Sequence, residues 1–197
     1  MREEFKYTDV AQPEESVAEQ PEVAGAITQS CYDMLHTIIL PITVVFLLLT
    51  FVFRLVNVDG QSMMDTLFDK DKVIVTNFLY TPKSGDVVVI SHGQQLYEPI
   101  IKRVIATEGQ SLSIDFAKGT VAVDGVILDE PYIKESPFKQ YDAEIPEVIP
   151  EGMVFVMGDN RNHSTDSRST RVGLINEDDV IGKAQFILYP FNRIKLL

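Results

Sequence analysis

The chain has few of the residues that define several common protein classes. Its one cysteine, Cys31, excludes an intrachain disulfide and a cysteine-based metal cluster. Only 17 basic side chains stand against 29 acidic ones, which gives a net charge of −12. Nucleic acids and anionic membrane surfaces attract clusters of Lys and Arg. The composition therefore argues against a general nucleic-acid binder.

The first 30 residues also lack apolar periodicity. They carry seven acidic and two basic side chains and are rich in Glu, Gln, Pro and Ala. A segment of this composition buries too little apolar surface to offset the entropy that folding costs. We therefore predict that residues 1–33 form an acidic tail that is disordered or weakly helical.

One long apolar run follows this tail. From Met34 to Phe53 polar side chains are rare, and a helix of that length spans about 30 Å, the thickness of one hydrocarbon core. A cleaved signal peptide has a shorter apolar core, a basic start and a small-residue cleavage site. Here the leader is acidic and the run is longer. We predict an uncleaved transmembrane helix over residues 34–55, with a buried helix of a soluble protein as the alternative.

Helical periodicity is scarce from residue 56 onward, where short β-branched runs alternate with turn residues, as is typical of strands. Asp124-Gly125 between two such runs favours a type I′ hairpin turn. We predict a mainly β fold, an antiparallel β-sheet domain over residues 56–197 behind a single N-terminal transmembrane helix. The acidic, proline-containing residues 129–152 are predicted to be mobile. The expected strands lie at 73–75, 87–90, 100–106, 112–114, 121–123, 126–128, 154–157 and 184–188.

Three polar segments of this β region contain candidate catalytic groups. Ser62 lies in a turn before the first expected strand, and a turn serine alone is most simply a solvated side chain. Lys102 lies inside an apolar strand pattern, where a charge costs free energy unless it is paired or neutralised. Residues 158–168 concentrate polar and charged side chains between two apolar strands, although a solvated turn is the simpler alternative.

Taken together, in this order and behind a membrane segment, these segments resemble the type I signal peptidases, membrane-bound serine peptidases that use a Ser/Lys dyad. The resemblance extends over residues 56–188 and implies a catalytic β domain without metal or organic cofactor. The matching segments are Ser-Met-x-x-Thr-Leu at 62–67, Gly-Asp-Val-Val-Val at 85–89, Lys-Arg-Val-Ile at 102–105 and Gly-Asp-Asn-Arg-x-x-Ser-x-Asp-Ser-Arg from 158.

The resemblance assigns Ser62 as the nucleophile and Lys102 as its general base. A serine hydroxyl needs a base to take its proton, and a lysine serves only when it is neutral. Lowering a lysine pKa from about 10.4 to about 7–8 costs roughly 4 kcal/mol, which desolvation can impose. The backbone N–H of Ser62 is expected to donate to the oxyanion hole. Some relatives add a side-chain hydroxyl two residues before the nucleophile, but Gly60 has none, so backbone in the region of Gly60 or water is expected to complete the hole.

The resemblance also implies five supporting residues around this dyad. Ser164 is expected to hydrogen-bond to the lysine amine and orient it. The other four are expected to form two ion pairs, Asp159 with Arg103 and Asp166 with Arg168.

Asp65 departs from the family pattern, because the family usually has proline three residues after the nucleophile. A carboxylate here would hold Lys102 protonated by raising its pKa. This departure supports one alternative, a catalytically impaired membrane-anchored relative that assists pilus or surface-protein assembly. A second alternative is a Ser/Lys peptidase that acts on itself or on one dedicated partner. A third is a Ser/His peptidase that uses His163.

By resemblance, the substrates are preproteins whose signal peptides are removed at the membrane surface, and the partners are signal peptides and membrane lipid, not nucleic acid. Small side chains are expected at the first and third positions before the cut. The extended substrate is expected to add as a strand between residues 56–61 and 99–101.

The resemblance further implies a plasma-membrane protein with a cytoplasmic N-terminus and an extracytoplasmic peptidase domain. The charges that flank the apolar run favour the opposite orientation. Arg54 follows the run, and residues 14–33 contain no Lys or Arg, so the positive-inside rule weakly places the N-terminus outside. One arginine is a small bias, and we retain the orientation that the resemblance implies.

Overall fold

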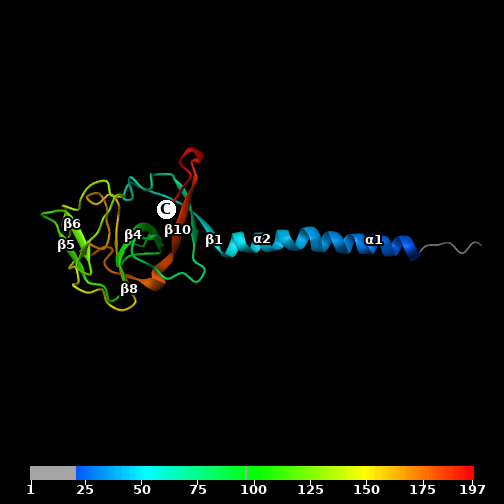
Figure 1. The fold of residues 1–197 in the computed structure, drawn as a ribbon, viewed down its shortest axis with the longest axis horizontal. Coiled ribbons are helices and arrows are strands. Elements are labelled where there is room, and N and C mark those ends of the chain that lie inside the picture. The colour runs from blue at the N-terminus through cyan, green and yellow to red at the C-terminus, as the bar shows by residue number, and fades with distance from the viewer. Residues whose placement is uncertain (1–20, 96) are drawn as a thin grey trace, which may run out of the picture. The chain divides into compact units, whose positions relative to one another are not determined.

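The computed structural model describes residues 21–95 and 97–197 and contains two compact units, one before Leu47 and one from Leu47 to Leu197. The first unit is helical (Figure 1). Helix α1 (Pro21–Met34) continues through a π-helical turn, η1 (Leu35–Ile39), into helix α2 (Leu40–Phe51). Pro41 explains the turn, because it has no N–H to donate to the preceding turn and its ring crowds a regular helix.

The helical segment Thr28–Thr50 is long and apolar enough to cross a membrane. Within the described residues it is the one helix that meets this test, with 23 residues and side chains that are not buried. Length and composition are therefore compatible with the predicted membrane span.

The structure corrects both predicted limits of this region. Residues 21–33, predicted to be disordered or weakly helical, belong to α1, because a helix propagates easily from an apolar segment that is already helical. Residues 1–20 of the predicted tail lie outside the described residues. The predicted helix 34–55 ends earlier, at Phe51, because Phe53 to Asn57 pair with a neighbouring strand and exchange helical for sheet hydrogen bonds.

The second unit contains two antiparallel sheets, which confirms the predicted mainly β fold. The first sheet consists of β1 (Phe53–Asn57), β2 (Lys72–Thr76), β3 (Val87–Ile90), β4 (Ile100–Ala106), β8 (Met153–Met157), β9 (Ile175–Asn176), β10 (Val180–Tyr189) and β11 (Lys195–Leu196). Its order is β1-β2-β10-β3-β4-β8-β9, with β11 also paired to β10. Two short 3-10 helices, η2 (Glu177–Asp179) and η3 (Phe191–Arg193), flank β10.

The second sheet is a three-stranded meander of β5 (Leu112–Asp115), β6 (Thr120–Val123) and β7 (Val126–Ile127). Asp124 and Gly125 join β6 to β7, and both have positive φ, at 53° and 77°. A type I′ turn requires positive φ at both central residues. The predicted hairpin is therefore present at the predicted position.

Strand β3 is central to the core, because all four of its side chains are buried. Val87 and Val89 pack into one apolar cluster, whereas Val88 and Ile90 pack into another. Successive side chains of a strand point to opposite faces, so apolar layers cover both faces of β3. Full burial of each such side chain contributes about 1.5–3 kcal/mol. Strand β4 pairs with β3 and is therefore fixed in position by this packed core.

Residues 129–152 were predicted to be mobile, but the structure shows that they are held against the loop of residues 158–168. Arg161 donates two hydrogen bonds to the Glu130 carboxylate, at 2.8 and 2.6 Å. Asn162 Nδ2 donates to the Ser136 carbonyl at 3.0 Å, and the Ala143 amide donates to a carbonyl of the loop at 2.9 Å. The composition of residues 129–152 predicted mobility because it does not reveal these partners, which lie in a later segment of the chain.

Candidate active site

The loop of residues 58–71, between β1 and β2, holds Ser62 in place. Met63 and Leu67, which follow it in the chain, are buried in the apolar cluster that also contains Val87. The Ser62 carbonyl accepts a hydrogen bond from the Asn160 amide at 3.0 Å. The serine side chain is half-buried at the edge of a cleft, while its backbone is fixed from two directions.

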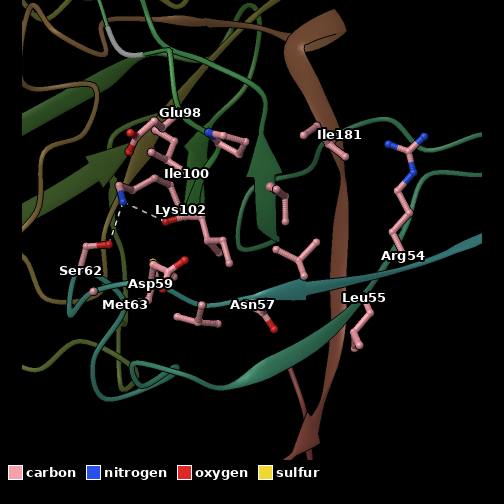
Figure 2. Close-up of a pocket in the computed structure, with 16 residues that line it drawn as sticks. Arg54, Leu55, Asn57, Asp59, Ser62, Met63, Glu98, Ile100, Lys102 and Ile181 are labelled. Atoms are coloured by element: carbon pink, nitrogen blue, oxygen red, sulfur yellow. Dashed lines mark hydrogen bonds between the residues drawn. The ribbon is translucent and has the colours of Figure 1, made fainter.

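Lys102 lies in the middle of β4, between β3 and β8. Its side chain is buried, with 4% of the residue exposed. Its Nζ lies 2.8 Å from Ser62 Oγ and donates to the carbonyl of Ile101 at 2.9 Å (Figure 2). The structure thus brings the predicted nucleophile and the predicted base within hydrogen-bond distance, although 40 positions separate them in the chain.

Burial lowers the pKa of Lys102 to about 8, because the charged amine loses its hydration. The carboxylates of Asp166 and Asp159 act in the opposite direction and keep the pKa from falling further. The sequence analysis attributed such an effect to Asp65. The structure assigns it to Asp166 and Asp159 instead, because Asp65 is exposed to solvent and both other carboxylates are buried.

Two buried ion pairs lie next to this lysine. Arg103 donates to both oxygens of Asp159, at 2.8 and 2.7 Å, and Arg168 donates to both oxygens of Asp166, each at 2.8 Å. Both pairs are the ones that the resemblance implies. The Gly158 amide also donates to Asp166, so this carboxylate is fully engaged. Bidentate pairs of this kind fix the geometry of the loop as well as its charge.

A cleft of about 820 Å³ begins at Ser62 and Lys102. One wall is β1 with residues 58–60, and the other is residues 98–101. Figure 2 shows Ser62 and Lys102 at one end of this cleft, with Arg54 and Leu55 at the other. The lining is mainly apolar and includes Val58, a residue of the apolar cluster beneath the serine loop.

The comparisons with known proteins agree with this arrangement. The family described as signal peptidase, peptidase S26, matches residues 31–189. Signal peptidase I P of Bacillus subtilis subsp. natto is 34% identical over 173 residues, which cover 83% of this chain and 91% of that protein. Signal peptidase I T of Bacillus subtilis is 29% identical over 192 residues, which cover 92% of this chain and 97% of the relative.

The chain belongs to the signal peptidase family, peptidase S26. A crystal structure of a signal peptidase I from Enterococcus faecalis also aligns with 54% of this chain and 98% of its own, at 26% identity and a TM-score of 0.44. The family match, together with the named relatives, gives no support to an assembly factor.

Two expectations carried over from the signal peptidase family differ from the structure. Ser164 is buried, but its Oγ has no hydrogen-bond partner among the described residues. It does not orient Lys102, because the lysine amine is directed to Ser62 Oγ and the Ile101 carbonyl instead. The resemblance identified a buried serine near the site but not where the amine points.

The second difference concerns the oxyanion hole expected in a signal peptidase. The Gly60 amide is not free to contribute, because it donates to Asp69 Oδ1 at 2.8 Å. Gly60 has a φ of +89°, which a residue with a side chain rarely adopts. The Ser62 amide, in contrast, makes no hydrogen bond to any residue in the part of the chain that the structure describes. It is the available donor at this position.

Sequence reasoning missed two residues that support the signal peptidase site from residues 129–152. Glu130 pairs with Arg161, and both side chains are almost fully buried. The Tyr132 ring stacks on the Arg103 guanidinium, with 3.8 Å between the guanidinium carbon and the ring centroid. Arg161, in the motif that starts at residue 158, was the available signal, because a buried arginine needs a carboxylate partner. No group of described His, Cys, Asp or Glu residues is arranged to hold a metal ion.

Proposed function

We propose that this chain is a membrane-anchored serine endopeptidase that removes signal peptides from preproteins, with Ser62 as nucleophile and Lys102 as general base. One observation carries the proposal: a buried lysine amine, with its pKa lowered to about 8, lies 2.8 Å from a serine hydroxyl at the end of a cleft. A neutral amine in this position is a base within reach of the proton that it must take.

In the first step, Ser62 Oγ attacks the substrate carbonyl carbon while Lys102 Nζ accepts the hydroxyl proton. The Ser62 amide donates to the oxygen on which negative charge develops. The C–N bond then breaks, and the leaving amine takes the proton from Lys102. The signal peptide stays bound to Ser62 as an ester.

In the second step, a water molecule attacks this ester. Lys102 accepts a proton from the water and returns it to Ser62 Oγ as the C–O bond breaks, so the signal peptide leaves with a free carboxylate. The Asp159–Arg103 pair joins β4, which carries Lys102, to the segment from residue 158, and the Asp166–Arg168 pair fixes that segment, whose Asn160 amide holds the Ser62 carbonyl. These four residues therefore act as positioning residues.

The cleft supports an extended substrate that binds as an added strand between β1 and residues 99–101. Backbone hydrogen bonds would give affinity, and the shallow apolar lining would select small side chains at the first and third positions before the cut. The apolar helix Thr28–Thr50 would anchor the enzyme in the plasma membrane. By family resemblance, the N-terminus is cytoplasmic and the peptidase domain lies outside.

The Ser/His alternative has less support. His163 is exposed, and its ring forms no hydrogen bond to any of the described residues, whereas Ser62 Oγ accepts a hydrogen bond from Lys102 Nζ. The geometry also fits a Ser/Lys peptidase that acts on itself or on one dedicated partner, and substrate breadth separates that alternative from a general processing enzyme.

The test is cleavage of several unrelated preproteins with an Ala-x-Ala site by the full chain in detergent. We expect Ser62→Ala to abolish cleavage, Lys102→Ala to lower kcat/KM by about 10²–10⁴-fold, and His163→Ala to be tolerated. Ser113→Ala and Lys83→Ala are matched controls, because both side chains are exposed and neither residue lines the cleft. A wild-type chain that cleaves none of the preproteins, or a fully active Lys102→Ala variant, would refute the proposal.

A further inference from the structure

A second cavity, of about 280 Å³, adjoins the dyad and shares Ser62 and Lys102 with the larger cleft. The two cavities continue in different directions. The larger cleft continues along β1 and residues 98–101, whereas the second one continues toward the motif that starts at residue 158. We name the second cavity the exit pocket. Its residues outside the large cleft are Gln61, His163, Thr165 and Arg171.

The residues that line the exit pocket differ in character from those that line the cleft. Ile100 is its one aliphatic side chain, and all four residues that belong to it alone are polar or charged. An extended peptide that passes through both cavities therefore meets a mainly apolar lining on one side of Ser62 and additional polar and charged side chains on the other.

The charges of the exit pocket do not balance. The Asp59 carboxylate is paired with Lys70, whose Nζ lies 3.2 Å away. Arg171, in contrast, is exposed and forms no ion pair with any residue in the described part of the chain. An arginine side chain stays charged at every physiological pH. The pocket thus presents a permanent positive charge that has no ion-pair partner among the described residues.

We propose that the exit pocket binds the first residues after the cleaved bond and that Arg171 makes it prefer an acidic side chain there. This inference rests on the proposed function, because it requires the scissile bond at Ser62 Oγ. If the apolar cleft holds the signal-peptide end, a continuous extended chain has its other end in the exit pocket. The substrate class is then preproteins whose mature part begins with Asp or Glu near the cut.

The arrangement acts on the first step of the reaction. The mature part stays in contact with Arg171 until the C–N bond breaks, so an acidic residue there strengthens binding of the reacting complex. The guanidinium is exposed, so solvent and salt weaken this attraction. Exposed charge pairs contribute little individually, which corresponds to a preference of about two- to fivefold.

The experiment compares three preproteins that are identical up to the cut and carry Asp, Ala or Lys in the first two positions after it. The measured quantity is the ratio of kcat/KM for the Asp substrate to that for the Lys substrate, so a general loss of activity cancels. For the wild-type full chain at low salt we expect a ratio of about two to five. Arg171→Gln should bring the ratio close to one, Arg171→Glu should reverse it, and added salt should reduce it.

Lys83→Glu is the matched control, because it makes the same change of charge at an exposed position outside both cavities and should keep the wild-type ratio. A wild-type chain that cleaves all three substrates equally would overturn the exit-pocket proposal and leave the proposed function intact. So would an Arg171→Glu variant that keeps the preference for Asp. A wild-type chain that cleaves none of the three would overturn the proposed function and this inference with it.

Discussion

Lys102 shows how the environment of one residue sets its chemistry. A lysine on a solvated strand would be protonated at neutral pH, but burial here lowers its pKa to about 8 from a usual value of 10.5. This difference corresponds to about 3 kcal/mol of unfavourable free energy while the amine is charged. Packing of the flanking strands must offset that cost, as buried core residues of β3 and β4 do.

The lowered pKa predicts the pH dependence of cleavage. We expect kcat/KM to rise with pH, with an apparent pKa near 8, because only the neutral amine of Lys102 can accept the Ser62 proton. A preprotein with uncharged residues around the cut, assayed from below to above this pKa, provides the measurement. A rate that is constant across that range would contradict the assignment of Lys102 as base.

The same shift has a consequence for stability. The folded chain loses the Lys102 proton at about pH 8 and the unfolded chain at about pH 10.5, so the unfolded state binds more protons between these values. The contribution of Lys102 to the free energy of unfolding therefore rises with pH across this window. Below about pH 8 both states are protonated, and the full cost of burying the charge is present.

At the scale of elements, residues 129–152, which we call the strap, are hydrogen-bonded to the segment of residues 158–168. Glu130 and Tyr132 contact Arg161 and Arg103, which belong to two different parts of the site. Charged groups with so little exposure are stable only when they are paired. The strap therefore supplies the counter-charge for Arg161 and an aromatic contact for Arg103.

Glu130→Gln tests this role. The substitution leaves the Arg161 guanidinium buried without a counter-charge, and we expect the free energy of unfolding to fall by about 3 kcal/mol. Urea denaturation of the full chain in detergent provides the measurement. Glu135→Gln is the control, because Glu135 lies in the same strap but is exposed. Equal midpoints for the two variants would show that the pair does not stabilise the fold.

At the scale of the whole molecule, the chain contains two compact units, one helical and one built from β-sheets. The β unit has its own apolar clusters, and the third of these joins the two sheets through residues such as Leu112, Val121 and Phe155. A chain with a complete core of this kind is expected to fold without an added helix. The apolar helix would then serve to localise the enzyme rather than to build its site.

Removal of residues 1–51 tests that division. We expect the shortened chain to keep its sheets and its kcat/KM for a short soluble peptide, because β1 begins at Phe53. Cleavage of a preprotein embedded in vesicles should fall by about a hundredfold, since enzyme and substrate no longer share one surface. Circular dichroism, vesicle flotation and the two cleavage assays provide the measurements. Equal loss on both substrates would mean that the helix supports the active site itself.

The sequence by itself determined much of the fold and predicted the two residues of the proposed dyad. Alternating β-branched runs located the principal strands, because side-chain alternation along a strand is a local property. The Asp124-Gly125 turn is likewise local. Spaced motifs pointed to Ser62 and Lys102. Hydropathy located the apolar helix but not its end, because pairing of Phe53 with a later strand decides where the helix stops.

Only the tertiary structure decided how these groups work together. The Lys102 pKa depends on burial between strands. Whether the Ser164 hydroxyl and the Gly60 amide form hydrogen bonds depends on which partners the folded chain brings close. The Glu130–Arg161 pair joins residues 31 positions apart. The exit pocket combines Ser62 with Arg171 across a still longer separation. Distances, desolvation and unpaired charges are properties of the folded chain, since residues far apart in the sequence create them.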